Sequence, residues 1–482
     1  MPEQINSCLG RVDITGRDKA PTKDSAQDHS LSHFLRLLFR LLDEHQVRYC
    51  VLHSWEGLPN ELPSDLDLAV HPRDRAKLAS VFQALFDDGY QPVQHQHHGE
   101  GQKFDFVWFE AQGMRFANID VNAEYREGGL VLMRAEDMVL GRKRVNCFWT
   151  ADPGVEFTYL LAKKTLKGSL PGRQAERLKT LVDEIGSLGA EKIAGDLFGK
   201  RWKERVVEAC RGGSLGDLLP VLNKRLWFTR LTQYPLTPVR HLLRQVPRLI
   251  NRSLRPIGLF VVILGPDGVG KSTLVGRLAE SLEQAAFNRF RIFHWRPNVI
   301  APQKETGLAA ADPHDEPPRG TLGSIVALSG ILLDYWLGFA FVLRPFLVRS
   351  GLVMFDRYYH DLLIDPARYR YGGPMWLAKF LGRFVPPPDL IFLVLDAGDE
   401  VIFSRKREVP PEELRRQREG YRQFTLGAKR ATLVNTDRGI EPTVEEASRF
   451  IVEFMSQRFQ CRNARWLSCK LAGSEANRAA GR

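Results

Sequence analysis

A glycine-rich segment between two apolar patterns constrains this chain more than any other feature of the sequence. Residues 265–273 read GPDGVGKST and match the pattern GxxxxGK[ST] in full. The apolar run LFVVIL (259–264) precedes the segment, and Leu274, Leu278 and Leu282 follow it at helical spacing. A buried strand that enters such a loop, with a helix after it, is the context in which this pattern binds phosphate groups. We therefore expect a phosphate-binding loop (P-loop) at residues 265–273.

The chemistry of this loop predicts both a nucleotide and a metal ion. Glycines leave backbone N–H groups free to turn toward phosphate oxygens, and the N-terminus of the following helix adds partial positive charge. Lys271 is expected to reach the terminal phosphates of ATP, and the Ser272 hydroxyl is expected to ligate Mg²⁺. A glycine-rich turn without function is the alternative. The expected nucleotide-binding residues of the loop are Gly265, Pro266, Asp267, Gly268, Val269, Gly270, Lys271, Ser272 and Thr273.

Composition places this loop in a basic, globular protein of more than one domain. The length of 482 residues suggests roughly two to four domains, and 44% hydrophobic with 26% charged residues is typical of a soluble protein. The net charge of +11 favours phosphorylated partners or an acidic membrane surface. The six cysteines form no CxxC pair, and residues 1–25 lack the apolar run of a signal peptide. We expect a cytoplasmic protein without a zinc site or a disulfide framework.

The sequence after Pro256 alternates strand-like and helical segments, which predicts an α/β fold with a parallel sheet. Residues at the carboxyl ends of strands are of special interest there, because open α/β sheets bind ligands at that edge. The motifs after the P-loop are Asp356-Arg357-Tyr358 behind the apolar run LVMF, the strand PPPDLIFLVLD (386–396), an arginine-rich stretch (404–424) and LVNTD (433–437).

Together these motifs resemble the thymidylate kinase family of nucleoside monophosphate kinases, over residues 256–458. The resemblance implies that Asp267 contacts the sugar of the acceptor. It implies that Arg357 holds the acceptor phosphate by a forked, charge-assisted contact and that Asp356 holds magnesium, directly or through water. The alternative for Asp356 and Arg357 is a buried ion pair.

The resemblance also assigns residues that cover the nucleotide. Arg405 and Arg407 belong, by this resemblance, to a lid that closes over the transferred phosphoryl group and offsets its developing charge. Asn435 is expected close to the adenine base. The alternative for the arginines is a solvated basic helix. The catalytic residues implied are Lys271, Asp267, Asp356, Arg357, Arg405 and Arg407.

The segment after Asp-Arg-Tyr departs from the family. Residues 359–374 (YHDLLIDPARYRYGGP) stand where thymidylate kinases carry small and aromatic residues that read thymine. His360, Arg368 and Arg370 either bind another acidic acceptor or lie on a surface loop. We expect ATP-dependent phosphorylation of a nucleoside monophosphate, with dTMP to dTDP the leading candidate. The alternatives are a kinase for a sugar or other metabolite, and a non-catalytic nucleotide-binding regulatory protein at a membrane.

A second group of chemically interesting residues lies in the N-terminal third. Alternation along the strand-like run DLDLAV (65–70) puts Asp65 and Asp67 on one face, and Asp120 lies on a later run, FANIDVN. Three converging carboxylates suit two-metal activation of a nucleotide α-phosphate, so all three are candidate metal ligands. Three nearby histidines, His95, His97 and His98, are assigned instead to a polar loop.

This N-terminal pattern resembles the nucleotidyltransferase family over residues 31–150. In that family a Gly-Ser pair precedes the Asp-x-Asp strand and grips the triphosphate. Ser54 corresponds to the serine, whereas His53 stands in place of the glycine. The alternative is a solvent-facing acidic edge of a strand.

Two stretches outside the motifs bear on domain organisation. Residues 218–266 contain no acidic residue, and their prolines predict a basic linker broken into short pieces. Residues 320–343 are strongly apolar but are interrupted by Asp334, whereas a spanning helix needs roughly 20 apolar residues. We interpret them as part of a buried helical hairpin (320–350), with a membrane helix as the alternative.

The predicted class is α/β, with a C-terminal P-loop kinase fold, a small nucleotidyltransferase-like α/β domain and a helical middle. The expected partner is a small nucleotide substrate, without specific nucleic-acid binding. Peripheral membrane contact and a homodimer are both compatible with the sequence. The predicted segments are a disordered N-terminus (1–30), the nucleotidyltransferase-like domain (31–150), a helical region with the basic linker (151–255), the kinase-like domain (256–458) and a disordered tail (459–482).

Overall fold

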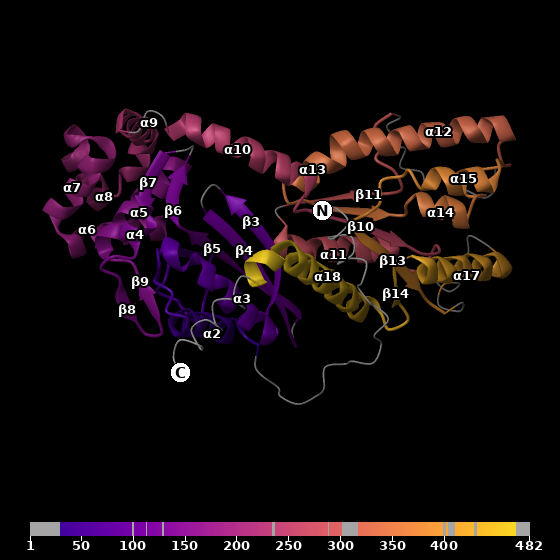
Figure 1. Cartoon of the computed structure of the whole chain (residues 1–482), viewed down its shortest axis with the longest axis horizontal. Helices are drawn as coiled ribbons and strands as arrows, with labels where there is room; N and C mark the ends of the chain where they lie inside the picture. Colours follow the sequence, from indigo (N-terminus) through magenta and orange to yellow (C-terminus); the bar gives the residue numbers. More distant parts are fainter. Residues whose placement is uncertain are drawn as a thin grey trace. The chain divides into compact units, whose positions relative to one another are not determined.

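The structure is a computed structural model, and it divides into two compact units (Figure 1). The front unit comprises Gln27–Ile250 and the chain from Arg462 onward, and the rear unit comprises Asn251–Cys461. The predicted disorder at 1–28 and 469–482 lies outside the described residues. The described residues are 29–98, 101–111, 113–127, 130–233, 237–287, 289–300, 317–398, 402, 410–428 and 431–468.

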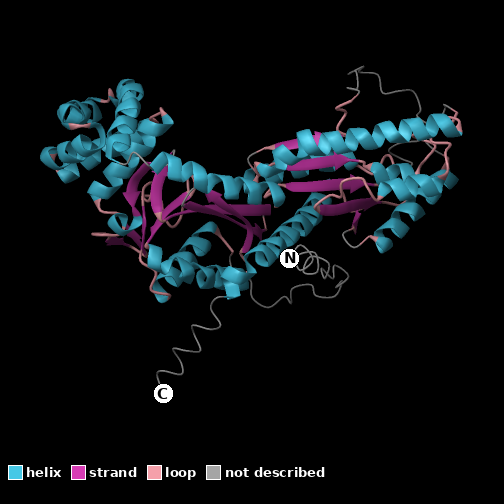
Figure 2. Cartoon of the chain, turned by 45° about the horizontal axis from the view of Figure 1, so that its top comes forward, coloured by secondary structure: helices cyan, strands magenta, loops and turns pink. Residues whose placement is uncertain are grey.

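A five-stranded parallel sheet forms the centre of the rear unit (Figure 2). Its strand order is β11-β12-β10-β13-β14. Strands β10 and β12 are buried along their whole length, which explains their continuous apolar sequences. Ile263 of β10 pairs with Asp356 of β12, so the P-loop and the Asp-Arg-Tyr motif leave the sheet at one edge. The strands are β10 (Leu259–Leu264), β11 (Phe290–Phe293), β12 (Leu352–Asp356), β13 (Leu390–Asp396) and β14 (Thr432–Asn435).

Helices surround this sheet, and the arrangement confirms the predicted α/β class with a parallel sheet. The last of them, α18, continues to Ser468, so the tail predicted to be disordered from residue 459 is helical over its first ten residues, 459–468. The rear helices are α11 (Lys271–Ala286), α12 (Thr321–Gly338), the π-helical turn η3 (Phe339–Leu343), α13 (Arg344–Val348), α14 (Tyr359–Ile364), α15 (Met375–Gly382), α17 (Pro411–Gly427) and α18 (Ile440–Ser468).

The predicted buried hairpin at 320–350 is wrong. Residues Thr321–Val348 form one uninterrupted helical run, α12–η3–α13, and much of its apolar surface is exposed. Asp334 does not end the helix, because its carboxylate accepts backbone N–H bonds from Val299 and Ile300 (2.6 and 3.0 Å). The charge is thereby accommodated inside a continuing helix, and no turn is needed to expose it.

The front unit contains a seven-stranded mixed sheet in the order β3-β4-β5-β2-β1-β9-β8. Strands β2 and β5 run parallel, as do β1 and β9, and the other neighbours are antiparallel. The three histidines assigned to a loop lie on β3 instead, which pairs with β4 over its length. The strands are β1 (Tyr49–Val51), β2 (Leu66–Val70), β3 (Gln91–His98), β4 (Gly101–Glu110), β5 (Gly113–Asn122), β8 (Lys143–Val145) and β9 (Phe148–Thr150), with the hairpin β6 (Glu124–Glu127) and β7 (Leu130–Arg134) apart from the sheet.

The helical middle belongs to the front unit's core. Apolar residues of its helices form one buried cluster with Leu132 of β7. Of the prolines predicted to break the basic linker, the prediction is wrong for Pro247, because it lies inside the long helix α10, whereas α10 begins beside Pro238 and ends before Pro256. Pro235 lies outside the described residues. The helices are α2 (Leu31–Glu44), η1 (Pro72–Lys77), α3 (Leu78–Asp87), α4 (Ala135–Met138), α5 (Pro153–Lys167), α6 (Gly172–Ile185), α7 (Ser187–Phe198), η2 (Lys200–Trp202), α8 (Lys203–Gly212), α9 (Leu215–Gln233) and α10 (Thr237–Leu254).

Candidate functional site

The P-loop of the rear unit connects β10 to α11, as the sequence predicts. Gly265, Gly268 and Gly270 have φ angles of +145°, +80° and +95°. Side-chain-bearing residues rarely adopt such angles, so the loop needs glycine at these positions for its shape. Gly270 is also the residue before the first turn of α11, whose free backbone N–H groups face the loop.

Lys271 is buried at the mouth of this loop. Its Nζ donates hydrogen bonds to the carbonyl oxygens of Gly265 (2.8 Å) and Pro266 (2.7 Å), and it lies 3.6 Å from Asp267 Oδ1. Burial, followed by the nearby guanidinium of Arg357, lowers the pKa of Lys271 to about 8. A phosphate group at the loop would stabilise the ammonium form, because it adds negative charge beside a desolvated cation.

Ser272 and Asp356 lie together although they are 84 residues apart, with Ser272 Oγ donating to Asp356 Oδ2 at 2.8 Å. Burial opposes ionisation of Asp356, but His294 at 3.7 Å, the charge of Lys271 and the hydrogen bond from Ser272 lower its pKa to about 2. Asp356 Oδ1 is buried and has no hydrogen-bond partner among the described residues. A hydroxyl beside a carboxylate with a spare oxygen fits Mg²⁺, which prefers oxygen ligands.

The acceptor side of the site is a network of arginines and carboxylates. Arg357, held at a φ of +84°, donates to Asp361 (2.6 Å) and to Asp267. Arg368 donates to the second oxygen of Asp267. Of the three basic residues left open by the sequence, Arg368 therefore joins the site, whereas Arg370 donates to the carbonyl oxygen of Pro317.

Two residues of α17 add hydrogen bonds to the carboxylates of residues 359–374 in this network. Tyr421 donates its hydroxyl to Asp361, and Gln417 donates to Asp365 (3.1 Å). His360 is largely buried there, and burial lowers its pKa to about 4. The sequence did not single out Tyr421 or Gln417, because neither belongs to a motif.

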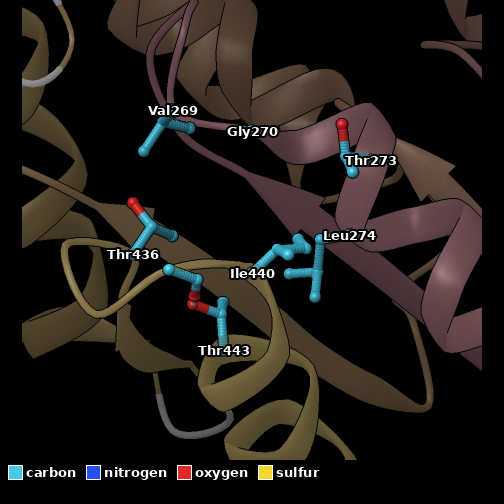
Figure 3. A pocket seen from close by; sticks show the side chains of 8 residues that line it. Val269, Gly270, Thr273, Leu274, Thr436, Ile440 and Thr443 are labelled. Carbon is cyan, nitrogen blue, oxygen red and sulfur yellow. Dashed lines mark hydrogen bonds between the residues drawn. The ribbon is translucent and has the colours of Figure 1, made fainter.

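A pocket of about 200 Å³ lies between the P-loop and the turn that follows β14 (Figure 3). Val269 and Leu274 line one side, and Thr436, Ile440 and Thr443 line the other. The predicted base-side residue, Asn435, ends β14 next to this pocket but does not line it. Its Oδ1 accepts the backbone N–H of Asp437 (2.7 Å) and so shapes the turn.

The predicted lid residues Arg405 and Arg407 lie outside the described residues. Two arginines farther along the same stretch, Arg418 and Arg422 of α17, pair with Asp396 at the carboxyl end of β13 (2.9 and 2.7 Å). Part of the arginine-rich stretch is therefore tied to the sheet edge and is not a fully solvated helix.

The front unit brings the predicted carboxylates to neighbouring strands, since Asp67 of β2 is paired in register with Asp120 of β5. Asp67 Oδ2 lies 2.8 Å from both Lys163 Nζ and His53 Nε2, and its Oδ1 accepts a hydrogen bond from Tyr159 (3.1 Å). Burial opposes ionisation of Asp67, but His53 and Lys163 outweigh it and lower its pKa.

The other two carboxylates differ from Asp67. Asp65 accepts hydrogen bonds from Lys103 (3.1 Å) and Asn118 (3.2 Å). Burial, with Asp67 and Asp65 nearby, raises the pKa of Asp120 to about 6. Across the described ranges, no group of three or more His, Cys, Asp or Glu residues is arranged to hold a metal ion. The metal role of these three residues stays a prediction.

Comparisons with known proteins bear on the rear site. No family model matches the chain. A thymidylate kinase of Xanthomonas euvesicatoria pv. vesicatoria is 27% identical over 144 residues, which are 30% of this chain and 58% of that protein. One from Xanthomonas campestris pv. campestris is 29% identical over 146 residues, with the same two shares, 30% and 58%.

A thymidylate kinase of Exiguobacterium is 27% identical over 154 residues, 31% of this chain and 69% of that protein. The chain thus spans little more than half of the Xanthomonas proteins, about 58% of their length. These similarities, with the parallel sheet and its P-loop, support one conclusion: this chain contains a thymidylate-kinase-like P-loop kinase region.

Proposed function

We propose that the rear unit transfers the γ-phosphoryl group of ATP to a nucleoside monophosphate, with dTMP the leading acceptor. The observation that carries the proposal is the meeting of Ser272, Asp356 and Arg357 at one sheet edge. Phosphoryl transfer needs the ATP phosphates, the magnesium ion and the acceptor phosphate to lie close together, and these three residues could bind them at that edge. The similarity to thymidylate kinases supports the same reaction class.

In this reaction a phosphate oxygen of the acceptor attacks the γ-phosphorus of ATP. The bond from that phosphorus to the β–γ bridging oxygen breaks, and ADP leaves with the bonding electrons. Lys271 would stabilise the terminal phosphates, Ser272 and Asp356 would hold a magnesium ion, and Arg357 would orient the acceptor phosphate. Bound magnesium neutralises charge on the phosphates. Arg405 and Arg407 are proposed to close over the transferred group.

A second candidate is phosphoryl transfer to another phosphorylated acceptor, such as a sugar phosphate. Asp267, expected to contact the acceptor sugar, is already held by both Arg357 and Arg368. Arg368 belongs to the segment where this chain departs from thymidylate kinases, and its guanidinium adds a second positive charge beside the acceptor site. This altered acceptor side, with Arg368 bound to Asp267, is the observation that favours the second candidate.

An acceptor panel decides between these readings and the non-catalytic alternative. ADP release from ATP and Mg²⁺ is measured with the full chain and dTMP, other nucleoside monophosphates, or sugar phosphates. Stimulation by dTMP or by another nucleoside monophosphate supports the first candidate, and stimulation by a sugar phosphate alone supports the second. Release that no acceptor stimulates refutes phosphoryl transfer and leaves the nucleotide-binding regulatory protein.

For the front unit we infer a nucleotidyltransferase-like fold in a cytoplasmic protein without specific nucleic-acid binding. The Asp65-Leu66-Asp67 strand beside Asp120 supports the fold. A shared fold does not carry a shared activity. Pyrophosphate release from a nucleoside triphosphate with Mg²⁺, compared between the wild type and Asp120→Asn, tests whether the metal-dependent reaction is present. Equal release by the two proteins would refute a catalytic role for Asp120.

A further inference from the structure

A cavity of about 550 Å³ in the front unit combines carboxylates with an unusual group of lysines. Asp65, Asp67 and Asp120 line one part of it. Lys163, Lys164 and Lys167, from the last two turns of α5, line another. Helical spacing places Lys167 four residues after Lys163 and three after Lys164, so the ammonium groups share one region of the cavity.

These carboxylates do not fit a divalent metal pair in their present arrangement. Both oxygens of Asp67 are engaged, one by Tyr159 and the other by Lys163 and His53. Both oxygens of Asp65 are engaged as well. A metal ion at Asp67 would have to displace an ammonium group, and Lys163 already supplies the positive charge that the carboxylate requires.

Lys164 is the least explained residue of the group. Lys164 as a whole residue is only 6% exposed, but its ammonium group is not among the fully buried unpartnered atoms and opens into the cavity that it lines. Burial, and then the charges of Lys167 and Lys163, lower its pKa. Crowding and partly desolvating three like charges costs free energy, and an anion in the cavity would offset that cost.

The favourable dipole at the C-terminus of α5 is the ordinary explanation for lysines at this place. It accounts for lysines whose ammonium groups lie in solvent. It does not account for three lysines that line one cavity, where a shorter or neutral side chain at Lys164 would serve the helix equally well.

We propose that the front cavity binds a phosphorylated small molecule through Lys164 and Lys167, without a bridging divalent ion. A phosphate group carries up to two negative charges and three acceptor oxygens, which suit two ammonium groups that have no anionic partner among the described residues. Lys163 adds a third positive charge nearby, but its N–H groups already face Asp67, His53 and Tyr159. The cavity volume lies within the range of small-molecule sites, and Tyr125 and Tyr159 give it an aromatic wall. The proposal does not depend on the reaction of the rear unit.

Calorimetric titration of the full chain with inorganic pyrophosphate in EDTA tests this proposal. The Lys271→Ala background removes the ammonium group of the P-loop, so that the front cavity dominates the signal. We expect metal-free binding, and we expect Lys164→Met to weaken it about tenfold or more. Lys192→Met, an equal change of charge on the exposed surface of α7, is the control and should leave binding unchanged.

Thermal unfolding separates a ligand-binding role from a structural one. Lys164→Met should raise the melting temperature by about 2 °C or more, because it removes a positive charge that lies beside Lys163 and Lys167. A lower melting temperature would support the helix-dipole explanation. Binding that appears only with Mg²⁺, or that is equal in Lys164→Met and Lys192→Met, would overturn the proposal.

Asp67→Asn gives opposite results under the two interpretations of the cavity. If lysines hold the ligand, removing the carboxylate frees Lys163 and strengthens pyrophosphate binding in EDTA. If Asp67 is a metal ligand, the same substitution abolishes binding that depends on Mg²⁺. Lys164→Met remains informative if Asp67→Asn fails to fold.

The exposed apolar side of α12 in the rear unit carries a second, independent inference. Leu322 is 81% exposed, Val326 73% and Phe341 72%, and Leu333 and Trp336 continue the same stripe. The indole of Trp336 donates to the carbonyl oxygen of Phe384, just beyond α15 (2.8 Å). This bond joins the stripe to the exposed residues Trp376, Phe380 and Phe384. We call these eight residues the apolar face.

The exposed charged residues of the segment that carries the apolar face are all basic. Within residues 317–388, all of which are described, the four carboxylates are buried. The exposed charged residues of the same range are Arg319, Arg349, Lys379 and Arg383. Exposed aromatic and aliphatic side chains on a segment whose exposed charges are basic match an anionic lipid surface.

Thr321–Val348 is the one helical run among the described residues that is long and apolar enough to cross a membrane. Its other side is fixed to the rear unit, however. Asp334 is hydrogen-bonded to the backbone at 298–300, and Tyr335 donates to the carbonyl oxygen of Trp295. We infer that the helix lies in the interface of an anionic membrane, because insertion across the bilayer would break these bonds.

Co-sedimentation with vesicles tests this surface. We expect the full chain to pellet with phosphatidylcholine vesicles containing about 30 mol% phosphatidylglycerol, and to be released by high salt. Leu322→Glu should abolish pelleting, whereas Leu188→Glu, at the equally exposed Leu188 of α7, should not. No pelleting of the wild type, or a solution homodimer that Leu322→Glu converts to monomer, would overturn the inference.

Discussion

The two charged sites of this protein hold their positive groups in different ways. In the rear unit, glycines shape a loop of backbone N–H groups around a single buried lysine, Lys271. In the front unit, three lysine side chains from one helix face carboxylates from two strands. The P-loop is contiguous in sequence, and its backbone shape alone sets where a phosphate can bind. The front cavity is assembled from distant residues, and the ligand that it can bind depends on which of its charged groups lack a partner.

The largest expected effect separates the two sites completely. Lys271→Ala should lower kcat for phosphoryl transfer by about 10³-fold or more, because one ammonium group stabilises the charge of the transferring phosphates. Pyrophosphate binding in the front cavity should not change. Steady-state ADP release and calorimetry on the same preparation check both statements. A loss at both sites would show that the comparison is mistaken.

The second substitution tests whether Asp356 binds Mg²⁺ in the rear site. Asp356→Asn should lower kcat about 10²-fold and raise the Mg²⁺ concentration required for half-maximal rate. The substitution removes the negative charge of a carboxylate whose Oδ1 has no hydrogen-bond partner among the described residues and could bind the metal ion. Titration of activity with Mg²⁺ measures this. If Mg²⁺ dependence is the same as in the wild type, Asp356 is no metal ligand.

A smaller effect concerns the acceptor. Arg368→Ala should raise the KM for the acceptor about tenfold with little change in the KM for ATP, because Arg368 approaches Asp267 on the acceptor side. Arg370→Ala, two residues away, is the matched control. Equal KM values for the acceptor in the two variants would show that Arg368 does not contribute to acceptor binding.

The smallest effect is a pH dependence of ATP binding. The pKa of Lys271 is lowered to about 8, and the ammonium is the form that pairs with phosphate. Below pH 8 the group is charged in the free protein, and affinity should be flat. Above pH 8 a proton must first be bound, so affinity should fall by up to about tenfold per pH unit. A flat profile to pH 10, or the same profile in Lys271→Ala, contradicts this assignment.

Sequence reasoning succeeded where function rests on contiguous motifs. The P-loop, the parallel sheet and the proximity of Asp356 to Ser272 follow from a local pattern and from the rule that strand ends share an edge. Pairing of Asp67 with Asp120 followed from alternation along one strand and the expectation of a neighbouring strand.

The failures have a common physical cause, which is tertiary context. In the sequence, Lys163 and Lys164 are indistinguishable from lysines at the solvent-exposed end of a helix. Only the structure shows that they line a cavity with Asp67 of β2 and Asp120 of β5. Strand β3 carries too many polar residues to be read as a strand, yet pairing with β4 satisfies its backbone. Asp334 suggested a turn, because no local signal shows that backbone N–H groups from residues 298–300 would accommodate its charge.

Transfer of label from [γ-³²P]ATP to dTMP, by the wild type and by Lys271→Ala, tests the central claim most directly. We predict labelled dTDP, or another labelled diphosphate when the acceptor is changed, from the wild type and almost none from the variant. Absence of labelled product with every acceptor tried, or equal labelling by both proteins, would contradict the proposed phosphoryl transfer at the P-loop.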